Sequence, residues 1–220
     1  MIKNIVFDLD GVLFDGCDLH ATLFINAVSQ IRPDITIQKE YHDEKLNGLP
    51  TKEKLKILNI TGKEAEQIYI VKQELTNKHL ASIGPSDKNF TICEELKKLG
   101  LNIYCVSNSI RSSIDTILTQ MGIIHMFSGI ISNQDIHEPK PSPIPYTTLY
   151  KKFNLLPEEC LILEDSEFGI MSATQSGGFT LCVRNCDDVT ISNILDTIEA
   201  IKRNPTVLTY SLLQNGVLNI

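Results

Sequence analysis

The alternation of strand-like and helix-like segments beyond Asn89 constrains the fold more than any other feature of this chain. Short apolar runs such as Leu101–Val106 and Phe179–Val183 each follow a helical pattern that ends in glycine. Such alternation predicts a parallel sheet with helices on both faces. We therefore predict an α/β protein with a Rossmann-like, doubly wound parallel sheet. The expected helices are 92–99, 111–121, 146–153, 168–175 and 191–202, and the expected strands are 101–106, 129–132, 161–164 and 179–183.

One more strand is expected near the N-terminus, where Ile5–Phe7 precede Asp8, Asp10 and Gly11. A short β-branched and aromatic run before a glycine indicates a buried parallel strand. Ligands of open α/β sheets bind at the carboxyl ends of such strands. Asp8 and Asp10 would stand at that end, and Gly11 would leave the backbone free to approach a phosphate. The alternative is a turn with two solvated acids.

The segment between Asp15 and Ser82 has no convincing strand pattern. Apolar residues at helical spacing instead predict amphipathic helices at 18–31, 51–58 and 63–80. We therefore predict an inserted helical cap. The predicted domains are an α/β catalytic core of residues 1–14 and 83–220 and a small cap of residues 15–82. The tail 204–220 is apolar enough to pack, but its pattern predicts no position.

Three later segments carry polar side chains close to predicted strand ends. They are Ser107-Asn108 after the second strand, Lys140 between prolines, and Glu164-Asp165 after the fourth strand. Together with Asp8-Leu9-Asp10-Gly11, these segments resemble the four motifs of the haloacid dehalogenase-like superfamily of phosphotransferases. The resemblance covers the chain from Ile2 to about Val183, with all four motifs in order.

The resemblance implies a phosphatase that acts on a small phosphorylated metabolite through an aspartyl-phosphate. Asp8 would be the nucleophile, a covalent role open to carboxylates. Asp10 would first protonate the leaving group and then activate water. Ser107 and Asn108 would bind phosphoryl oxygens at the start of a helix. Lys140 would balance the charge of Asp8 and of the transferring group.

The same resemblance implies Mg²⁺ as the cofactor. Glu164 and Asp165 would form an oxygen-rich site with Asp8, the kind of ligand set that Mg²⁺ prefers. The backbone carbonyl of Asp10 would also touch the metal in this family. Mg²⁺ would make the attack of one anion on another feasible.

Each motif alone also has a plain structural explanation. Ser107 or Ser109 could cap a helix that starts near Ile110, Lys140 could be a solvated loop lysine, and Glu164-Asp165 could form an exposed turn. The presence of all the motifs in register favours the functional interpretation. One departure from the family pattern is Ile144, which stands where an aspartate commonly caps the next helix.

The inserted helices resemble the small cap of phosphoglycolate and sugar-phosphate phosphatases. Such caps exclude water and select the substrate. Residues 48–52 match the position of the family's specificity loop. Lys52 and Lys72 are therefore candidates for holding an anionic or polyhydroxylated leaving group, although a solvated helix face is the alternative for both.

A phosphosugar mutase resembling β-phosphoglucomutase is the second hypothesis, because that enzyme shares the cap. His20 follows Asp15 at the mutase spacing, and Lys72 lies near the expected lysine. However, Thr51 stands where the mutase has an arginine, and losing a bidentate guanidinium is costly for a protein that binds two phosphates. His20 also occurs in capped phosphatases, so we favour the phosphatase. A non-catalytic binding protein is the third hypothesis, disfavoured because every catalytic position holds a competent residue.

Charge and composition limit the partners. The net charge of −7 argues against broad nucleic-acid binding, which needs a basic face. No apolar run approaches the roughly 20 residues that span a bilayer. The six cysteines form no C-x-x-C pair, so we expect no zinc site, no structural disulfide and a cytoplasmic location. We expect a small phosphorylated substrate and a monomer or weak homodimer.

Overall fold

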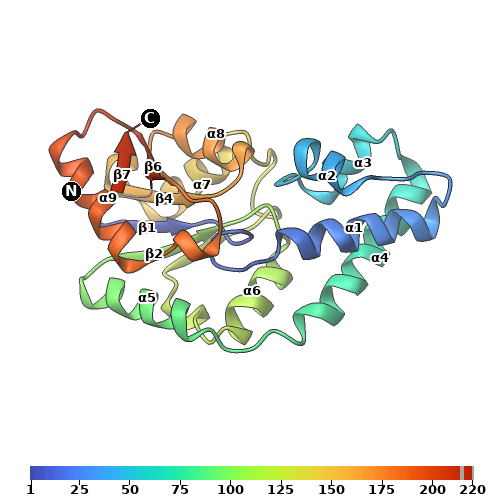
Figure 1. The fold of residues 1–220 in the computed structure, drawn as a ribbon, viewed down its shortest axis with the longest axis horizontal. Helices are drawn as coiled ribbons and strands as arrows, with labels where there is room; N and C mark the ends of the chain where they lie inside the picture. Colours follow the sequence, from blue (N-terminus) through green and yellow to red (C-terminus); the bar gives the residue numbers. More distant parts are fainter. Residues whose placement is uncertain (214–215, 220) are drawn as a thin grey trace.

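The computed structural model describes residues 1–213 and 216–219 and has the predicted α/β architecture (Figure 1). Its strands are β1 (Asn4–Phe7), β2 (Asn102–Val106), β3 (Gly129–Ile131), β4 (Cys160–Glu164), β5 (Phe179–Cys182), β6 (Thr209–Leu213) and β7 (Gly216–Asn219). Within the described residues they form one sheet in the order β3-β2-β1-β4-β5-β6-β7. Strands β1 to β6 are parallel, and β7 pairs antiparallel with β6.

Helices cover both faces of the sheet, and further helices lie beyond its carboxyl edge (Figure 1). The helices beyond the carboxyl edge are α1 (Cys17–Ile31), α2 (Lys39–Lys45), α3 (Thr51–Ile57) and α4 (Gly62–Leu80). The helices that cover the faces are α5 (Asp87–Lys98), α6 (Arg111–Gln120), α7 (Ile144–Phe153), α8 (Glu167–Gln175) and α9 (Ile191–Arg203). Apolar residues of α5, α6 and α9 pack on one face, whereas those of α7 and α8 pack on the other.

The central strand β1 contributes to the packing on both faces. Ile5 and Phe7 belong to the apolar cluster with α5, α6 and α9, and Val6 belongs to the cluster with α7 and α8. Side chains alternate along a strand, so a strand between two helix layers must be apolar throughout. Burying each such side chain stabilises the fold by roughly 1.5–3 kcal/mol. This packing fixes the strand that carries Asp8 at its end.

Helices α1 to α4 form the cap and have an apolar cluster of their own. Its buried members include Phe24 and Val28 on α1, Leu55 on α3 and Ile68 on α4. Helix α2 was not predicted, because its sequence KEYHDEK has no apolar stripe and buries only His42. The cap therefore encloses a polar residue that hydrophobic periodicity could not reveal.

The predicted elements of the core are present, with boundaries that differ by only a few residues. Helix α7 begins at Ile144 rather than at residue 146, with a proline in its first turn, a position that proline favours. The unplaced tail contains β6 and β7, which extend the sheet beyond β5. Residues 214, 215 and 220 of that tail lie outside the described residues.

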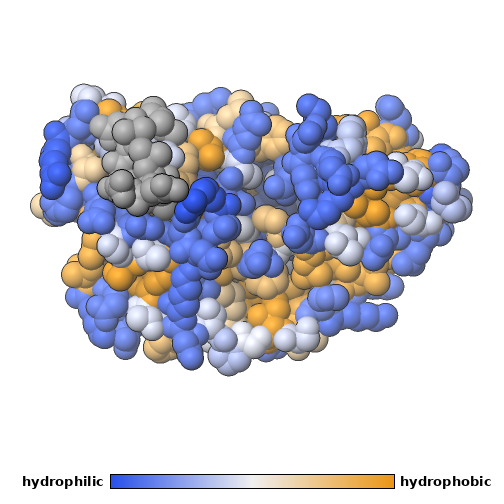
Figure 2. All heavy atoms as spheres, in the orientation of Figure 1, coloured by the Kyte–Doolittle hydropathy of each residue, from blue (hydrophilic) through white to orange (hydrophobic). Residues whose placement is uncertain are grey.

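Hydrophilic side chains cover most of the face seen in Figure 2, and apolar side chains show between them in patches. The large apolar side chains that are exposed come from many separate elements, among them Tyr41, Ile57, Phe90, Leu156 and Leu195. In the described part of the chain, no helix is both long enough and apolar enough to cross a membrane.

Candidate active site

The candidate active site lies at the carboxyl ends of β1, β2 and β4. Phe7, the last residue of β1, pairs with Leu163 of β4 and with Cys105 of β2, so the residues that follow these strands converge. The strand order reverses between β1 and β4, which is where open α/β sheets bind ligands. A cavity of about 620 Å³ lies there, lined by the strand ends and by α1, α3 and α4 of the cap.

Asp8 and Lys140 form a buried ion pair at the floor of this site. The Lys140 ammonium donates to Oδ1 of Asp8 over 2.6 Å, to Oε1 of Glu164 over 2.5 Å and to the Val106 carbonyl over 2.9 Å. Burial acts to lower the pKa of Lys140, but the two carboxylates outweigh it and raise the pKa. Lys140 is only 3% exposed, so it is not the solvated loop lysine of the alternative explanation.

In the described part of the chain, only one of the two carboxylate oxygens of Glu164 has hydrogen-bond partners. Its Oε1 accepts from Lys140 and from the phenol of Tyr146, whereas its buried Oε2 has no hydrogen-bond partner among the described residues. Burial is the main cause that raises the pKa of Glu164. With an exposed fraction of 0%, Glu164 does not belong to an exposed turn. Tyr146 was not singled out from the sequence, because its position on α7 shows no motif of its own.

Three carboxylates in this region could hold a metal ion. One oxygen from each of Asp8, Glu164 and Asp165 lies within 4.8 Å of the other two. The buried Oδ1 of Asp165, like Oε2 of Glu164, lacks a partner in the described residues. Buried carboxylate oxygens without partners are costly, and a hard divalent cation would satisfy both. The residues therefore fit Mg²⁺.

Gly11 allows this cluster to be compact. Its φ of +86° is a backbone conformation that residues with side chains rarely adopt. A Cβ atom at this position would overlap the carboxylate of Asp165. The glycine of the first motif thus brings the loop after β1 against the loop after β4.

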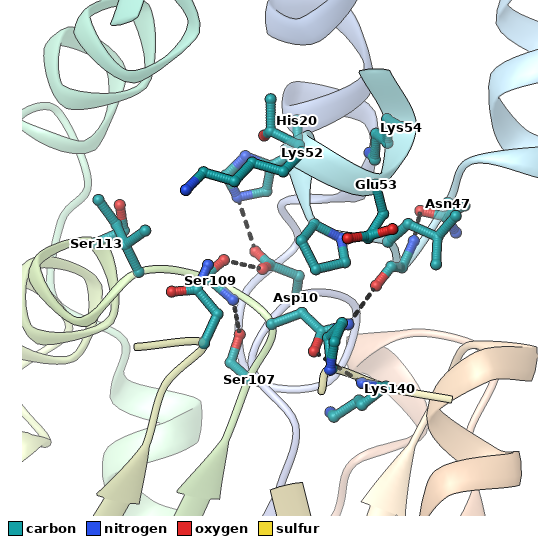
Figure 3. A pocket seen from close by; sticks show the side chains of 18 of the residues that line it. Asp10, His20, Asn47, Lys52, Glu53, Lys54, Ser107, Ser109, Ser113 and Lys140 are labelled. Atoms are coloured by element: carbon teal, nitrogen blue, oxygen red, sulfur yellow. Dashed lines mark hydrogen bonds and ion pairs between the residues drawn. The ribbon is translucent and has the colours of Figure 1, made fainter. Parts of the chain in front are cut away.

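Asp10 points away from these three carboxylates and toward the cap. His20 Nε2 lies 3.0 Å from its Oδ1, and Ser109 Oγ donates to its Oδ2 over 3.1 Å (Figure 3). Lys72 Nζ lies 3.3 Å from His20 Nδ1. A lysine ammonium can only donate, so His20 accepts at Nδ1, and its proton is then on Nε2, the ring nitrogen that faces Oδ1 of Asp10. Burial acts to raise the pKa of Asp10, but His20, Ser109 and Lys72 together lower it.

The serine motif forms a loop rather than a helix cap. Helix α6 begins at Arg111, and Ile110 occupies its N-cap position without a side-chain cap. The prediction that Ser107 and Asn108 stand at the start of a helix was therefore wrong, and so was the alternative of a serine cap. Ser107 is buried, and its Oγ accepts from the backbone of Ser109 over 3.0 Å.

Asn108 connects the core to the cap. Its Nδ2 donates to the Gly48 carbonyl over 2.8 Å, and its Oδ1 accepts from the backbone N–H of Lys140 over 3.2 Å. Gly48 also approaches Ser166, because a Cβ at Gly48 would lie 3.2 Å from the Ser166 hydroxyl. The loop of residues 48–52 therefore closes over the cavity.

The cap lysines differ in their surroundings. Lys52, Lys72 and Thr51 line the cavity. Lys52 is exposed, with Nζ 5.6 Å from the centre of the Tyr69 ring. Lys72 is half-buried, and burial lowers its pKa. The cavity has a further lining lysine, Lys54, which the sequence analysis missed because it lies in the run Lys-Glu-Lys-Leu-Lys, typical of a solvated helix.

Comparisons with known proteins relate this chain to one enzyme family. Residues 5–183 match the haloacid dehalogenase-like hydrolases. The β-phosphoglucomutase of Bacillus subtilis is 28% identical over 194 residues, covering 83% of each chain. The phosphoglycolate phosphatase of Vibrio cholerae is 27% identical over 189 residues, covering 81% of this chain and 83% of that protein. The crystal structure of β-phosphoglucomutase from Clostridium difficile shares the fold, with a TM-score of 0.80, 19% identity and coverage of 93% and 100%.

Proposed function

Because the chain belongs to the haloacid dehalogenase-like hydrolase family, we propose that it is a Mg²⁺-dependent phosphatase of a small phosphorylated metabolite, acting through an aspartyl-phosphate on Asp8. One observation carries this proposal. The Asp8 carboxylate lines the cavity beside three candidate groups for charge neutralisation, Lys140, Glu164 and Asp165, while the Asp10 carboxylate faces the cap side of the same cavity.

The proposed reaction has two halves. In the first, a carboxylate oxygen of Asp8 attacks phosphorus, the bond from phosphorus to the ester oxygen breaks, and Asp10 gives its proton to that oxygen. In the second, Asp10 takes a proton from water, and the water oxygen attacks phosphorus and releases Asp8 and inorganic phosphate. The negative charge of a bound phosphate opposes the pull of His20 and Lys72 and favours the protonated form of Asp10.

The other residues of the site orient the phosphoryl group and balance its charge. Lys140 keeps a positive charge against Asp8, and Ser107 offers its hydroxyl at the adjacent strand end. Asp8, Glu164 and Asp165, with the Asp10 carbonyl, would hold Mg²⁺, which neutralises the charge that develops during transfer. We propose residues 1–14 and 83–220 as the catalytic core and residues 15–82 as the lid that excludes water.

The phosphatase proposal is tested by incubating pure protein with Mg²⁺ and a panel of phosphomonoesters. Free phosphate and isomerised sugar phosphate are both measured. We expect phosphate release that disappears with excess chelator and returns when Mg²⁺ is added. Isomerisation without phosphate release would replace the phosphatase by a mutase. Neither product from any ester would favour a non-catalytic protein.

Substrate selection should reside in the cap. We expect Lys52→Ala to raise KM for the natural substrate about tenfold with little change in kcat, because it removes a contact made in both the ground and transition states. Lys72→Ala should raise KM as well and lower kcat modestly, because Lys72 contacts His20 beside Asp10. Steady-state kinetics with the natural substrate and with acetyl phosphate measure this. Exposed Lys78 on α4 supplies the matched control, Lys78→Ala.

Equal losses with acetyl phosphate and with the natural substrate would contradict this division of labour. Acetyl phosphate offers almost nothing for the cap to hold, so its turnover should barely depend on Lys52.

A phosphosugar mutase remains the second candidate, favoured by the contact of His20 with both Asp10 and Lys72. That arrangement can hold a sugar hydroxyl close to the acid–base group. For a mutase we expect His20→Ala to abolish isomerisation while reducing phosphate release only severalfold. The measurement is the ratio of isomerised product to free phosphate in both proteins. A ratio of zero in the unaltered protein removes the mutase.

A further inference from the structure

Lys54 is a buried cation that the proposed reaction does not use. It lies on α3, lines the cavity and is only 6% exposed. Its Nζ lies 2.9 Å from Nε2 of His42 and 5.4 Å from the centre of the Phe24 ring. In the described part of the chain, no carboxylate oxygen lies within 4.0 Å of this ammonium. A buried charge that lacks a counter-ion is destabilising unless something else compensates it.

His42 contacts the Lys54 ammonium but has no negative charge that could neutralise it. The ring is buried against Phe24, with centroids 5.9 Å apart, and its Nδ1 lies 3.5 Å from Asp43. Burial and the nearby Lys54 lower the pKa of His42 to about 4. The ring is therefore neutral near pH 7. A protonated Lys54 can only donate, so Nε2 of His42 then accepts and positions the ammonium.

An anion in the cavity would compensate the buried positive charge of Lys54. Burial is the largest cause that lowers its pKa to about 7, followed by the positive charge of Lys72. Glu53 also borders the cavity, but it is bonded to Lys56 over 2.7 Å. Packing alone does not require an ammonium here, because an apolar chain of similar length would fill the same space. Figure 3 shows Lys54, Lys52 and His20 on the cap side, across the cavity from Lys140.

We propose that Lys54, positioned by His42, binds a second anionic group, a phosphate or a carboxylate, on the leaving group of the substrate. The proposal rests on the proposed function and narrows its substrate class to phosphomonoesters that carry two anionic groups. It also bears on Thr51, which stands where the mutase has an arginine. Lys54, three residues further along α3, supplies a cation to the cavity from the same helix.

The test compares probes that differ in one anionic group. The first pair is fructose 6-phosphate and fructose 1,6-bisphosphate, and the second is glycerol 3-phosphate and 3-phosphoglycerate. Each is measured as an inhibitor of p-nitrophenyl phosphate hydrolysis in Mg²⁺. In the unaltered protein we expect the Ki of the two-anion member to be at least about tenfold lower, because charge-assisted contacts in a buried site are strong. The pair with the larger preference identifies phosphate or carboxylate.

Four variants separate a binding role from a structural one. Lys54→Met keeps the length of the side chain and should abolish the preference, with less than about a threefold change in p-nitrophenyl phosphate turnover. Lys54→Arg should restore part of the preference. His42→Phe keeps a ring but removes the acceptor, and should reduce the preference. Lys45→Met alters an exposed cap lysine outside the cavity and should change nothing. Melting temperatures show whether each variant is folded.

Two results would overturn the proposal. One is an unaltered protein that binds both members of each pair equally. The other is a folded Lys54→Met protein that keeps the preference. If the unaltered protein hydrolyses neither p-nitrophenyl phosphate nor any other phosphomonoester of the panel, the phosphatase proposal fails by itself. The shift in melting temperature that each probe causes then still tests the second anion site.

Discussion

Asp8→Asn is expected to lower kcat by roughly 10⁴-fold or more while leaving the fold intact. An amide cannot form the acyl-phosphate and is a poor ligand for a hard cation, so both of the roles proposed for Asp8 are lost together. The fold should persist because the buried Lys140 ammonium still faces the Glu164 carboxylate at 2.5 Å. No buried charge is left without a partner, which is the usual cause of severe destabilisation at such sites.

The measurement is single-substrate kinetics in saturating Mg²⁺, together with thermal unfolding. Exposed Asp15 lies in the same loop and supplies the control, because Asp15→Asn makes the same chemical change outside the cavity. We expect Asp15→Asn to retain nearly full activity. Trapping of radiolabelled phosphate on the protein should occur with the unaltered chain and be absent with Asp8→Asn. Near-normal turnover by Asp8→Asn would assign the nucleophile elsewhere.

Asp10→Asn is expected to lower kcat by about 10²–10⁴-fold, the usual contribution of a general acid–base group. The loss should depend on the leaving group. A sugar alkoxide needs a proton as it departs, whereas nitrophenolate departs without one, so the loss should be smaller for p-nitrophenyl phosphate. The amide oxygen can still face His20 Nε2, and the amide N–H can donate to the Ser109 hydroxyl, so the contacts of the side chain are largely kept.

The diagnostic quantity is therefore a ratio, the loss of kcat with an alkyl phosphate divided by the loss with p-nitrophenyl phosphate. We expect a ratio well above one for Asp10→Asn. Ser109→Ala, which removes one contact of Asp10 but keeps the acid, is the comparison and should give a ratio near one. A ratio near one for Asp10→Asn would mean that Asp10 does not protonate the leaving group.

The core was predictable because its signals are local. Alternation of apolar runs with helical patterns marked the strands, and glycines marked the ends of the helices. Parallel strands share one carboxyl edge, so Asp8, Ser107 and Asp165 could be expected to converge without any knowledge of register. The fold class and the family are confirmed. The chemical roles of these residues remain predictions.

What the sequence did not reveal depends on contacts between distant segments. The tail strand β6 is recognisable only from its pairing with β5, in which Tyr210 of β6 lies opposite Leu181 of β5. The link from Asn108 to the Gly48 carbonyl joins the core to the cap across 60 residues. Lys54 resembles its exposed neighbours in sequence, and only the packing of α2 and α3 buries it. Such features follow from how elements pack, which periodicity does not encode.

The separate apolar cluster of the cap has an evolutionary consequence. Phe24, Leu55 and Ile68 pack with one another rather than with the strands that carry Asp8. We expect a substitution among them to loosen the cap without disturbing the sheet, because distant sites of this kind act nearly additively. If the cap selects the substrate as proposed, cap sequences can change, and with them the substrate, while the residues at the strand ends are inherited unchanged. Descendants of such a chain would diverge fastest in residues 17–80.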